Sequence, residues 1–111
     1  MEKYTRMSGI FGAMSGDLEQ VRVWVEALVG TPSEAHESSD RGGDYYLFTG
    51  EHGEEIHVMK NEDVYDGEPI VDADAKWQIV VTIDEAPSDS KWLAALSGAA
   101  TQLERLSLKE Y

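Results

Sequence analysis

The sequence contains no cysteine, only three prolines, and nine basic residues against 22 acidic ones. Without cysteine the chain has no disulfide, no thiol nucleophile and no thiolate metal ligand, which fits a reducing cytosol. No apolar run approaches the roughly 20 residues that a membrane-spanning helix needs. The apolar run near the N-terminus is also too short and too broken for a signal peptide. We therefore expect a cytoplasmic protein without a membrane segment.

The size and hydrophobic content of the chain predict one folded domain over residues 1–111. A chain of 111 residues with 41% hydrophobic and 28% charged residues can bury a core without covalent cross-links. This composition is typical of a globular protein and not of a disordered one. We therefore expect a single domain without repeats.

The net charge of −13 is concentrated in one half of the sequence. Residues 40–89 hold 14 acidic residues, and only Arg41, Lys60 and Lys76 oppose them. Such a surface repels nucleic acid and anionic membranes and attracts basic proteins. A simpler interpretation is that the acidity keeps a small protein soluble. The charge therefore favours a basic protein partner without identifying one.

The segment 42–61 (GGDYYLFTGEHGEEIHVMKN) predicts a β-hairpin. Two runs rich in aromatic and branched residues flank 50–53, a short segment with a glycine at each end. The first run is apolar on both faces, which predicts a strand inside a sheet. In the second run Ile56 and Val58 alternate with other residues, so we expect one buried face and one solvent-exposed face. The residues expected on the exposed face are Glu55, His57 and Met59.

Helical spacing of apolar residues predicts two helices. The first begins at a cap within residues 15–17 and ends at Gly30. The second takes Ser88 or Asp89 as its N-cap and stops at Gly98. The side chains of the second helix that we expect to face inward are those of Trp92, Leu93 and Leu96.

Strand patterns predict the remaining elements at 4–14, 34–39 and 77–83. The run 77–83 is the most continuous in β-branched residues, so we expect it to be central and to end within 84–88, at Pro87. Residues 101–111 favour a last strand, although Leu103 would also fit a longer second helix.

The predicted order is β-α-β-β-β-β-α-β, which indicates an α+β fold. We expect a mainly antiparallel sheet of five to six strands with two helices on one face. This plan is related to the split βαβ arrangement of ferredoxin-like folds.

Histidines and carboxylates in the hairpin suggest a metal or small-ligand site as an alternative function. His52, Glu55 and His57 are ligand types that zinc accepts, and His36 could complete the set. On a strand Glu55 and His57 share a face while Glu54 points the other way, and His52 lies in the turn. These ligands meet only if the turn folds back.

No motif in the sequence indicates catalysis. The acidic run after Asn61 has the wrong register for an EF-hand loop, because glycine comes one residue late. The pair at 42–43 lacks the lysine of a phosphate-binding loop, and no HExxH motif is present. We therefore expect a protein that is not an enzyme and needs no cofactor.

The acidic segment 62–75 carries one aromatic residue, Tyr65, between Asp63 and Asp66. An aromatic anchor ringed by carboxylates suits an interface with a basic protein. Alternatively, Val64 and Tyr65 hold the segment against its own domain. The residues that we expect to bind a partner are Glu54, Glu55, Glu62, Asp63, Tyr65, Asp66, Glu68, Asp72 and Asp74.

A cysteine-free, strongly acidic α+β domain of this length resembles the bacterial immunity proteins that neutralise toxins of contact-dependent and polymorphic systems. The likeness lies in the character of the whole chain. The segments 36–46 (HESSDRGGDYY), 53–55 (GEE) and 66–69 (DGEP) also look like a recurring pattern in small bacterial proteins. The resemblance implies an inhibitor whose acidic surface binds a basic partner enzyme, most simply a nuclease.

Two alternatives remain open beside the immunity protein and the metal or ligand site. Small phage-encoded inhibitors of host defence nucleases look similar to this chain. A subunit that self-associates through an open sheet edge is also compatible with the polar strand at 34–39.

Overall fold

The computed structural model describes residues 6–13, 15–38, 43–61, 78–87, 89–99 and 102–110. Their elements follow the predicted order β-α-β-β-β-β-α-β, which confirms the α+β fold. The strands are β1 (Arg6–Ala13), β2 (Glu34–Ser38), β3 (Gly43–Thr49), β4 (Glu55–Lys60), β5 (Ile79–Pro87) and β6 (Leu103–Glu110). The helices are α1 (Leu18–Val29) and α2 (Lys91–Gly98).

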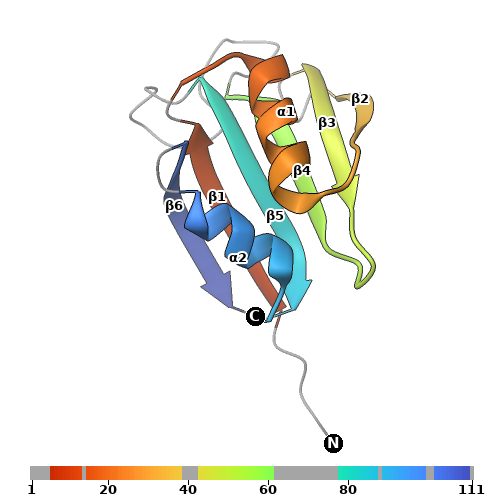
Figure 1. Ribbon diagram of the computed structural model, residues 1–111, viewed down its shortest axis with the longest axis vertical. Coiled ribbons are helices and arrows are strands. Elements are labelled where there is room, and N and C mark those ends of the chain that lie inside the picture. The colour runs from red at the N-terminus through yellow and green to blue at the C-terminus, as the bar shows by residue number, and fades with distance from the viewer. Residues whose placement is uncertain are drawn as a thin grey trace, which may run out of the picture.

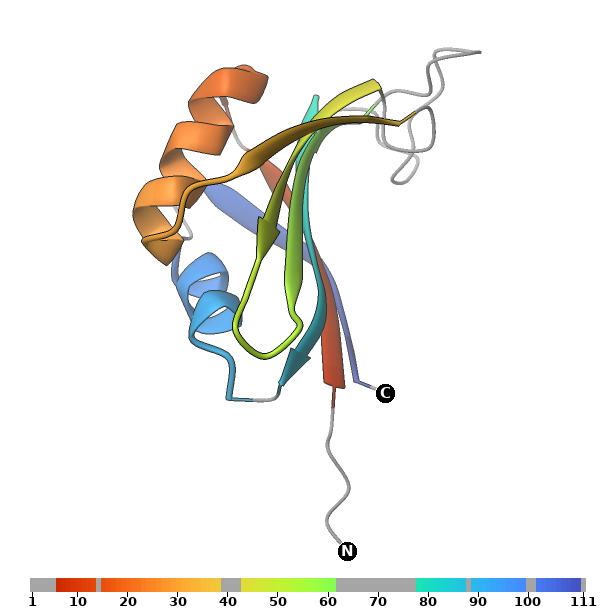
Figure 2. The ribbon, with the colours of Figure 1, turned by 90° about the vertical axis from the view of Figure 1, so that its right-hand side faces the viewer.

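The strands form a six-stranded sheet in the order β2-β3-β4-β5-β1-β6, shown in Figure 1. Every neighbouring pair is antiparallel. The first strand, β1, lies between β5 and β6, which are therefore parallel to each other and joined by α2. This is a split βαβ unit, as the sequence predicts. Both helices lie on one face of the sheet (Figure 2), and we call the other face the outer face.

The core lies between the helices and the sheet. From the sheet it takes Phe11, Phe48 and Ile83, and from the helices it takes Val25 and Leu96, all of them buried. Phe48, Ile56 and Ile83 stand side by side on β3, β4 and β5 because the strands pair in that register. Their alternation along each strand places one apolar row against the helices.

Helix α1 begins and ends where the sequence predicts. The Asp17 carboxylate accepts from the Gln20 backbone N–H at 2.9 Å, and the Gln20 side chain accepts from the Asp17 N–H at 3.0 Å. This reciprocal capping box satisfies two backbone donors that the first turn leaves unpaired. At the other end Gly30 has φ 69° and donates to the Glu26 carbonyl at 2.9 Å. A left-handed residue of this kind stops the helix, and glycine adopts it without a Cβ penalty.

The fifth strand extends beyond the predicted run 77–83 and ends at Pro87, the residue predicted to break it, whereas the predicted cap of α2 is wrong. Strand β5 continues to Pro87, because Asp84 and Glu85 together oppose Ser8 of β1 as a bulge. Glu85 has φ 57°, the left-handed conformation that lets the strand take up one extra residue. The strand resumes after the bulge, and α2 starts later than expected. Its N-cap is Ser90, whose hydroxyl accepts from the Leu93 N–H at 3.2 Å.

Most of the outer face of β4 is buried, contrary to the prediction, and Glu55 at its start is half-buried. His57 and Met59 are each only 4% exposed. Met59 and Val80 are buried together on this face, and Tyr45 and Leu106 pack against them. A strand in the middle of a sheet has neighbours on both sides, and their large side chains cover its second face as well.

The C-terminal segment forms β6, so the strand prediction holds and the longer-helix alternative does not. Strand β2 is an edge strand, as expected for its short polar sequence, and β6 is the opposite edge. The acidic segment 62–75, on which most of the predicted partner-binding residues fall, lies outside the described residues.

Candidate functional site

The described residues divide into two regions of very different charge. One region, the acidic meander, is formed by β2 to β5 with the residues that connect them (31–38, 43–61 and 78–87). Its only basic residue is Lys60, which leaves a net charge of −7. Its eight carboxylates belong to Glu34, Glu37, Asp44, Glu51, Glu54, Glu55, Asp84 and Glu85.

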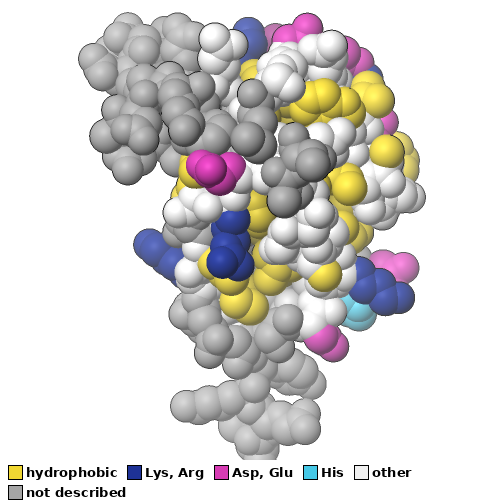
Figure 3. Space-filling model, turned by 60° about the vertical axis from the view of Figure 1, so that its left-hand side comes forward, with side chains coloured by type: hydrophobic (Ala, Val, Ile, Leu, Met, Phe, Trp, Pro, Cys, Tyr) yellow, Lys and Arg dark blue, Asp and Glu magenta, His cyan; other side chains and the backbone are white. Residues whose placement is uncertain are grey.

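The other described residues, in β1, β6, both helices and their flanking turns, are close to neutral. They carry six carboxylates and five basic side chains, a net charge of −1. Figure 3 brings the β6 edge forward and shows Lys and Arg side chains among hydrophobic and acidic ones. The charge of this region is therefore mixed, whereas that of the acidic meander has almost one sign.

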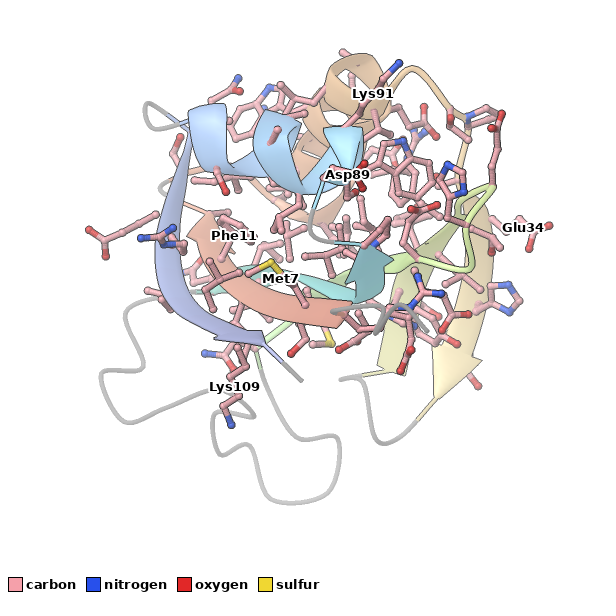
Figure 4. The ribbon with its side chains drawn as sticks, turned by 90° about the horizontal axis from the view of Figure 1, so that it is seen from below. Met7, Phe11, Glu34, Asp89, Lys91 and Lys109 are labelled. Atoms are coloured by element: carbon pink, nitrogen blue, oxygen red, sulfur yellow. The ribbon has the colours of Figure 1, made fainter. Side chains whose placement is uncertain are left out.

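Three carboxylates of the acidic meander belong to the outer face. Glu55 lies directly opposite Asp84, and Glu34 starts a row that continues through Leu47 to His57 on neighbouring strands. Residues directly opposite each other share a face of the sheet, and Phe48, Ile56 and Ile83 occupy the helix side. Figure 4 shows Glu34 pointing away from the molecule at the β2 edge. Of the three, Glu34 is exposed, and Glu55 and Asp84 are half-buried.

The loop of the β3–β4 hairpin is closed by two backbone hydrogen bonds. The Gly50 N–H donates to the Glu54 carbonyl at 2.8 Å, and the Gly53 N–H donates to the Gly50 carbonyl at 3.3 Å. Gly53 has φ 87°, a conformation that L-residues rarely adopt. The glycine at the end of the loop is thus required by the turn, which confirms the predicted hairpin.

Glu54 is a predicted partner-binding residue, and the structure places it inside the molecule. The residue is 4% exposed, and Oε1 accepts from the His52 backbone N–H at 3.1 Å. The side chain folds against Gly50 so closely that a Cβ at that position would lie 1.6 Å from Oε1. Glu54 therefore faces the helix side, whereas Glu55 belongs to the outer face, as the strand alternation predicts.

A cavity of about 560 Å³ opens beside this hairpin loop. The end of α1, the hairpin loop and the start of α2 line it, and Glu54 belongs to its wall. Figure 4 shows Asp89 and Lys91 at the start of α2, on the helix side of the sheet. The charged and titratable residues of the lining are Glu51, His52, Glu54, Asp89 and Lys91. The sequence gives no signal for this cavity, because its three walls are distant in the chain.

Arg6 fastens the hairpin loop to the bulge of β5. Its Nη1 donates to the carbonyl of His52 at 3.3 Å and to the carbonyl of Glu85 at 3.2 Å. One guanidinium thus bridges the hairpin loop, which lines the cavity, and the bulge of β5, because its several donors can serve two acceptors at once. The loop that carries Glu54 is held from both sides.

The histidines proposed as metal ligands are not brought together. The ring of Tyr45 lies between those of His36 and His57, with centroids 5.6 Å from each. His52 lies in the hairpin loop, where it is exposed. Within the described ranges no three His, Asp or Glu side chains are grouped to hold a metal ion.

A polar cluster that the sequence does not reveal joins α1 to β3 and to the start of β2. Arg22 pairs with Glu19 and, at 3.0 Å, with Glu26, and its guanidinium lies 5.2 Å from the centroid of the Tyr46 ring. The Tyr46 hydroxyl donates to Glu19 at 2.8 Å. Spacing three and four residues apart on a helix allows both ion pairs.

Glu26 also bridges the two charge regions. Its Oε2 accepts from the Ser33 hydroxyl at 2.7 Å and from the Ser33 N–H at 3.0 Å. These hydrogen bonds, helped by Arg22, lower the pKa of Glu26 below its ordinary value of 4.5, because they favour the charged form. The carboxylate thus ties the α1–β2 turn to the helix.

The other predicted partner-binding residues lie outside the described residues and stay predictions. These are Glu62, Asp63, Tyr65, Asp66, Glu68, Asp72 and Asp74. The described part of the acidic meander adds Glu34 and Asp84 to the candidates on the outer face, which the sequence could not place on one surface without the strand register.

No protein-family model and no curated protein matches this chain. Within the described residues, no helix is long and apolar enough to cross a bilayer: α1 has 12 residues and α2 has eight. The geometry offers two features that could bind another molecule, the carboxylates of the acidic meander and the charged cavity beside the hairpin loop.

Proposed function

We propose that this chain is a protein inhibitor of the immunity-protein kind, which binds and neutralises a basic partner enzyme through an acidic surface. The partner in this proposal is a cytoplasmic nuclease toxin or a similar basic enzyme. The inhibitor itself carries out no catalysis, uses no cofactor and binds neither nucleic acid nor membrane.

The observation that carries the proposal is the division of charge. The acidic meander holds a net charge of −7, and the other described residues hold −1. A surface of one sign on a small scaffold produces a directed field, which attracts a surface of the opposite sign and repels phosphates. Solubility alone needs net charge but not its concentration in one region of the fold.

The proposed mechanism is electrostatic association followed by occlusion. Carboxylates of Glu34, Glu55 and Asp84, together with those of the segment 62–74, would stand where a basic cleft otherwise holds substrate phosphates. Tyr65 would be the aromatic anchor of the interface. Long-range attraction raises the association rate, and that rate falls with added salt.

The proposal is tested by reversing charge in one region at a time. The partner is first captured from the native host, or co-expressed from the adjacent gene if that gene encodes a large toxin. The double variant Glu34→Lys/Glu55→Lys should then slow association at low salt by roughly tenfold or more. The variant Asp63→Lys/Asp66→Lys should have an effect of the same order. Stopped-flow fluorescence or biolayer interferometry measures the rate.

A matched control separates the position of the charge from its amount. The double variant Glu19→Lys/Glu104→Lys changes the net charge equally but lies in the near-neutral region. Its association rate should fall much less than that of Glu34→Lys/Glu55→Lys. Equal rates for both variants, or no change in either at low salt, would rule out docking through the acidic meander.

A phage-encoded inhibitor of a host defence nuclease would use the same chemistry, so the binding experiment does not distinguish it from an immunity protein. The identity of the captured partner distinguishes the two kinds of inhibitor. A secreted toxin supports the immunity protein, whereas a nuclease of host defence supports the phage inhibitor.

A further inference from the structure

We infer that the cavity beside the hairpin loop binds a guanidinium or primary ammonium group, with the carboxylate of Glu54 as its counter-ion. The cavity measures about 560 Å³ and lies between the end of α1, the hairpin loop and the start of α2. Its size is within the range of small-molecule sites and leaves room for a basic side chain or a small free cation.

Glu54 is the reason to expect a cation. The residue is 4% exposed, and the hydrogen bond to its carboxylate is donated by the backbone N–H of His52. The ion pairs among the described residues join Arg22 to Glu19 and Glu26, and His36 to Glu34, and none includes Glu54. A buried carboxylate is costly unless a cation or several donors compensate it. An entering guanidinium or ammonium group supplies that compensation.

The rest of the lining favours a cation over an anion. The carboxylates of Glu51 and Asp89 also border the cavity, and among the described residues of the lining Lys91 is the one lysine or arginine. The end of α1 reaches the cavity at Val29, and the last turn of that helix has no basic residue. The partial negative charge of a helix C-terminus therefore adds to that of the carboxylates.

The N-terminus of α2 carries a partial positive charge, which favours an anion over a cation. Part of its hydrogen-bonding capacity is already used within the helix. Its N-cap, Ser90, accepts from the Leu93 N–H, so the first turn does not present all its donors to a ligand. Three carboxylates against one lysine outweigh the partial positive charge of a short helix, which amounts to about half an elementary charge.

Trp92 gives the cavity an aromatic wall. It is partly buried, packs against the core and lines the cavity together with Val29 and Pro87. An indole ring attracts cations, and a guanidinium group or the methylene chain of a basic side chain also packs on apolar surface. A carboxylate beside an aromatic and apolar wall therefore suits an arginine or lysine side chain and its small analogues.

The guanidinium or ammonium group that enters the cavity can come from two sources with the same chemistry. It is either a basic side chain presented by a partner protein or a free small cation. Only the first source rests on the proposed function. Glu34 and Glu55, which test that function, do not line the cavity, so the two proposals can fail independently.

The test is an NMR titration of the ¹⁵N-labelled full chain with two cations, N-acetyl-arginine amide and butylammonium. We expect saturable shifts of the backbone amides of Gly50, His52 and Trp92, with dissociation constants of the order of millimolar. N-acetyl-leucine amide and acetate are the neutral and anionic controls, and they should cause no saturable shift at these amides.

Two variants test the role of the Glu54 carboxylate. Glu54→Gln keeps the shape and should weaken cation binding by about tenfold. Gly50→Ala keeps all charges but places a methyl group where the Glu54 side chain lies, so it should weaken binding as well. Glu51→Gln removes a charge from the exposed rim and should have a smaller effect. The amide spectrum of each variant establishes that it is folded.

The inference is overturned if neither cation gives saturable shifts up to about 100 mM, well above the expected dissociation constants. It is also overturned if folded Glu54→Gln binds the cations as well as the unchanged protein, or if the neutral amide binds equally well. The affinity of the captured partner for Glu54→Gln then shows which source supplies the cation. A weaker complex with Glu54→Gln identifies a basic side chain of the partner, and an unchanged complex identifies a free cation.

Discussion

The acidic meander and the near-neutral region share one core but place their carboxylates differently. In the near-neutral region, Glu19 and Glu26 of α1 both pair with Arg22. In the acidic meander, Glu55 lies directly opposite Asp84 on the same face of the sheet. Like charges placed opposite each other oppose folding by a fraction of a kcal/mol. An arrangement that does not help the fold is expected where a surface serves binding.

The largest loss of stability is expected for a core substitution where the two regions meet. Ile83 is fully buried and lies on β5, which pairs with β4 of the acidic meander and with β1 of the near-neutral region. Ile83→Ala should lower the free energy of unfolding by about 2–5 kcal/mol, because it leaves a cavity in the shared core. Urea unfolding followed by circular dichroism and by tryptophan fluorescence measures the loss.

The same urea unfolding measurements also test whether the two regions unfold together. Val23→Ala, at a position 48% exposed on α1, is the control and should change stability little. Coincident transitions by both probes are expected for one core. Two separate transitions in the unchanged protein would show that the regions are independent units.

The second-largest change in stability is expected for a glycine-to-alanine substitution made in each region. Gly53→Ala in the acidic meander should cost about 1–2 kcal/mol, because φ 87° is strained for any residue with a Cβ. Gly98→Ala at the end of α2 should instead stabilise the protein by up to about 1 kcal/mol, because the added methyl group meets no atom within 4 Å. Thermal unfolding measures both. Shifts of the same sign would contradict this account of the hairpin loop.

A smaller, pH-dependent effect is expected at the link between the regions. Ser33→Ala removes the hydroxyl that contributes most to lowering the pKa of Glu26. A carboxylate whose pKa is lowered on folding stabilises the protein above its unfolded value of 4.5 and loses this contribution as the pH falls through the folded value. The variant should therefore cost about 0.5–1 kcal/mol at neutral pH, the usual value of one hydrogen bond, and less at acid pH.

The control for this prediction is Ser97→Ala, which removes an exposed hydroxyl from α2. Its effect should be within a few tenths of a kcal/mol and should not change with pH. Urea titrations at neutral and acid pH compare the two variants. A loss in Ser33→Ala that is independent of pH would refute the assigned role of the hydrogen bond.

The smallest change in stability is expected for a single charge reversal made in each region. Glu55→Lys places a cation opposite Asp84 and should stabilise the protein by about 0.5 kcal/mol. Glu19→Lys breaks the pair with Arg22 and the hydrogen bond from Tyr46, so it should destabilise the protein by a similar amount. Both effects should diminish in high salt. Stabilisation by both variants would mean that total charge matters more than its arrangement.

Most of the fold could be predicted because its determinants are local. Helix α1 has a capping side chain at Asp17, apolar residues at helical spacing, and a stop at Gly30. The β3–β4 hairpin has a glycine at each end of its loop and alternating side chains on both sides. Each of these signals depends on a few neighbouring residues, so the sequence shows them directly.

What could not be predicted depends on neighbours that are distant in the chain. Burial of His57 on the outer face follows from the position of β4 between β3 and β5. The bulge at Glu85 lets β5 continue beyond residue 83, the end of the predicted run, because β1 pairs on both sides of it. The cavity and the burial of Glu54 need three separate segments in place. Alternation did predict that Glu54 and Glu55 point to opposite sides, but not that only one would be buried.

The position of β1 between β5 and β6 has a consequence for how the chain acquires its structure. Among the described residues, β1 pairs with β5 and β6, so it has no partner in the sheet until the residues from 79 onward have been synthesised. Pairings between such distant segments require large loops to close, and they slow folding relative to helical proteins of the same size. Until then, the N-terminal strand emerges from the ribosome with both of its edges unpaired, and it is the segment that chaperones would be expected to shield.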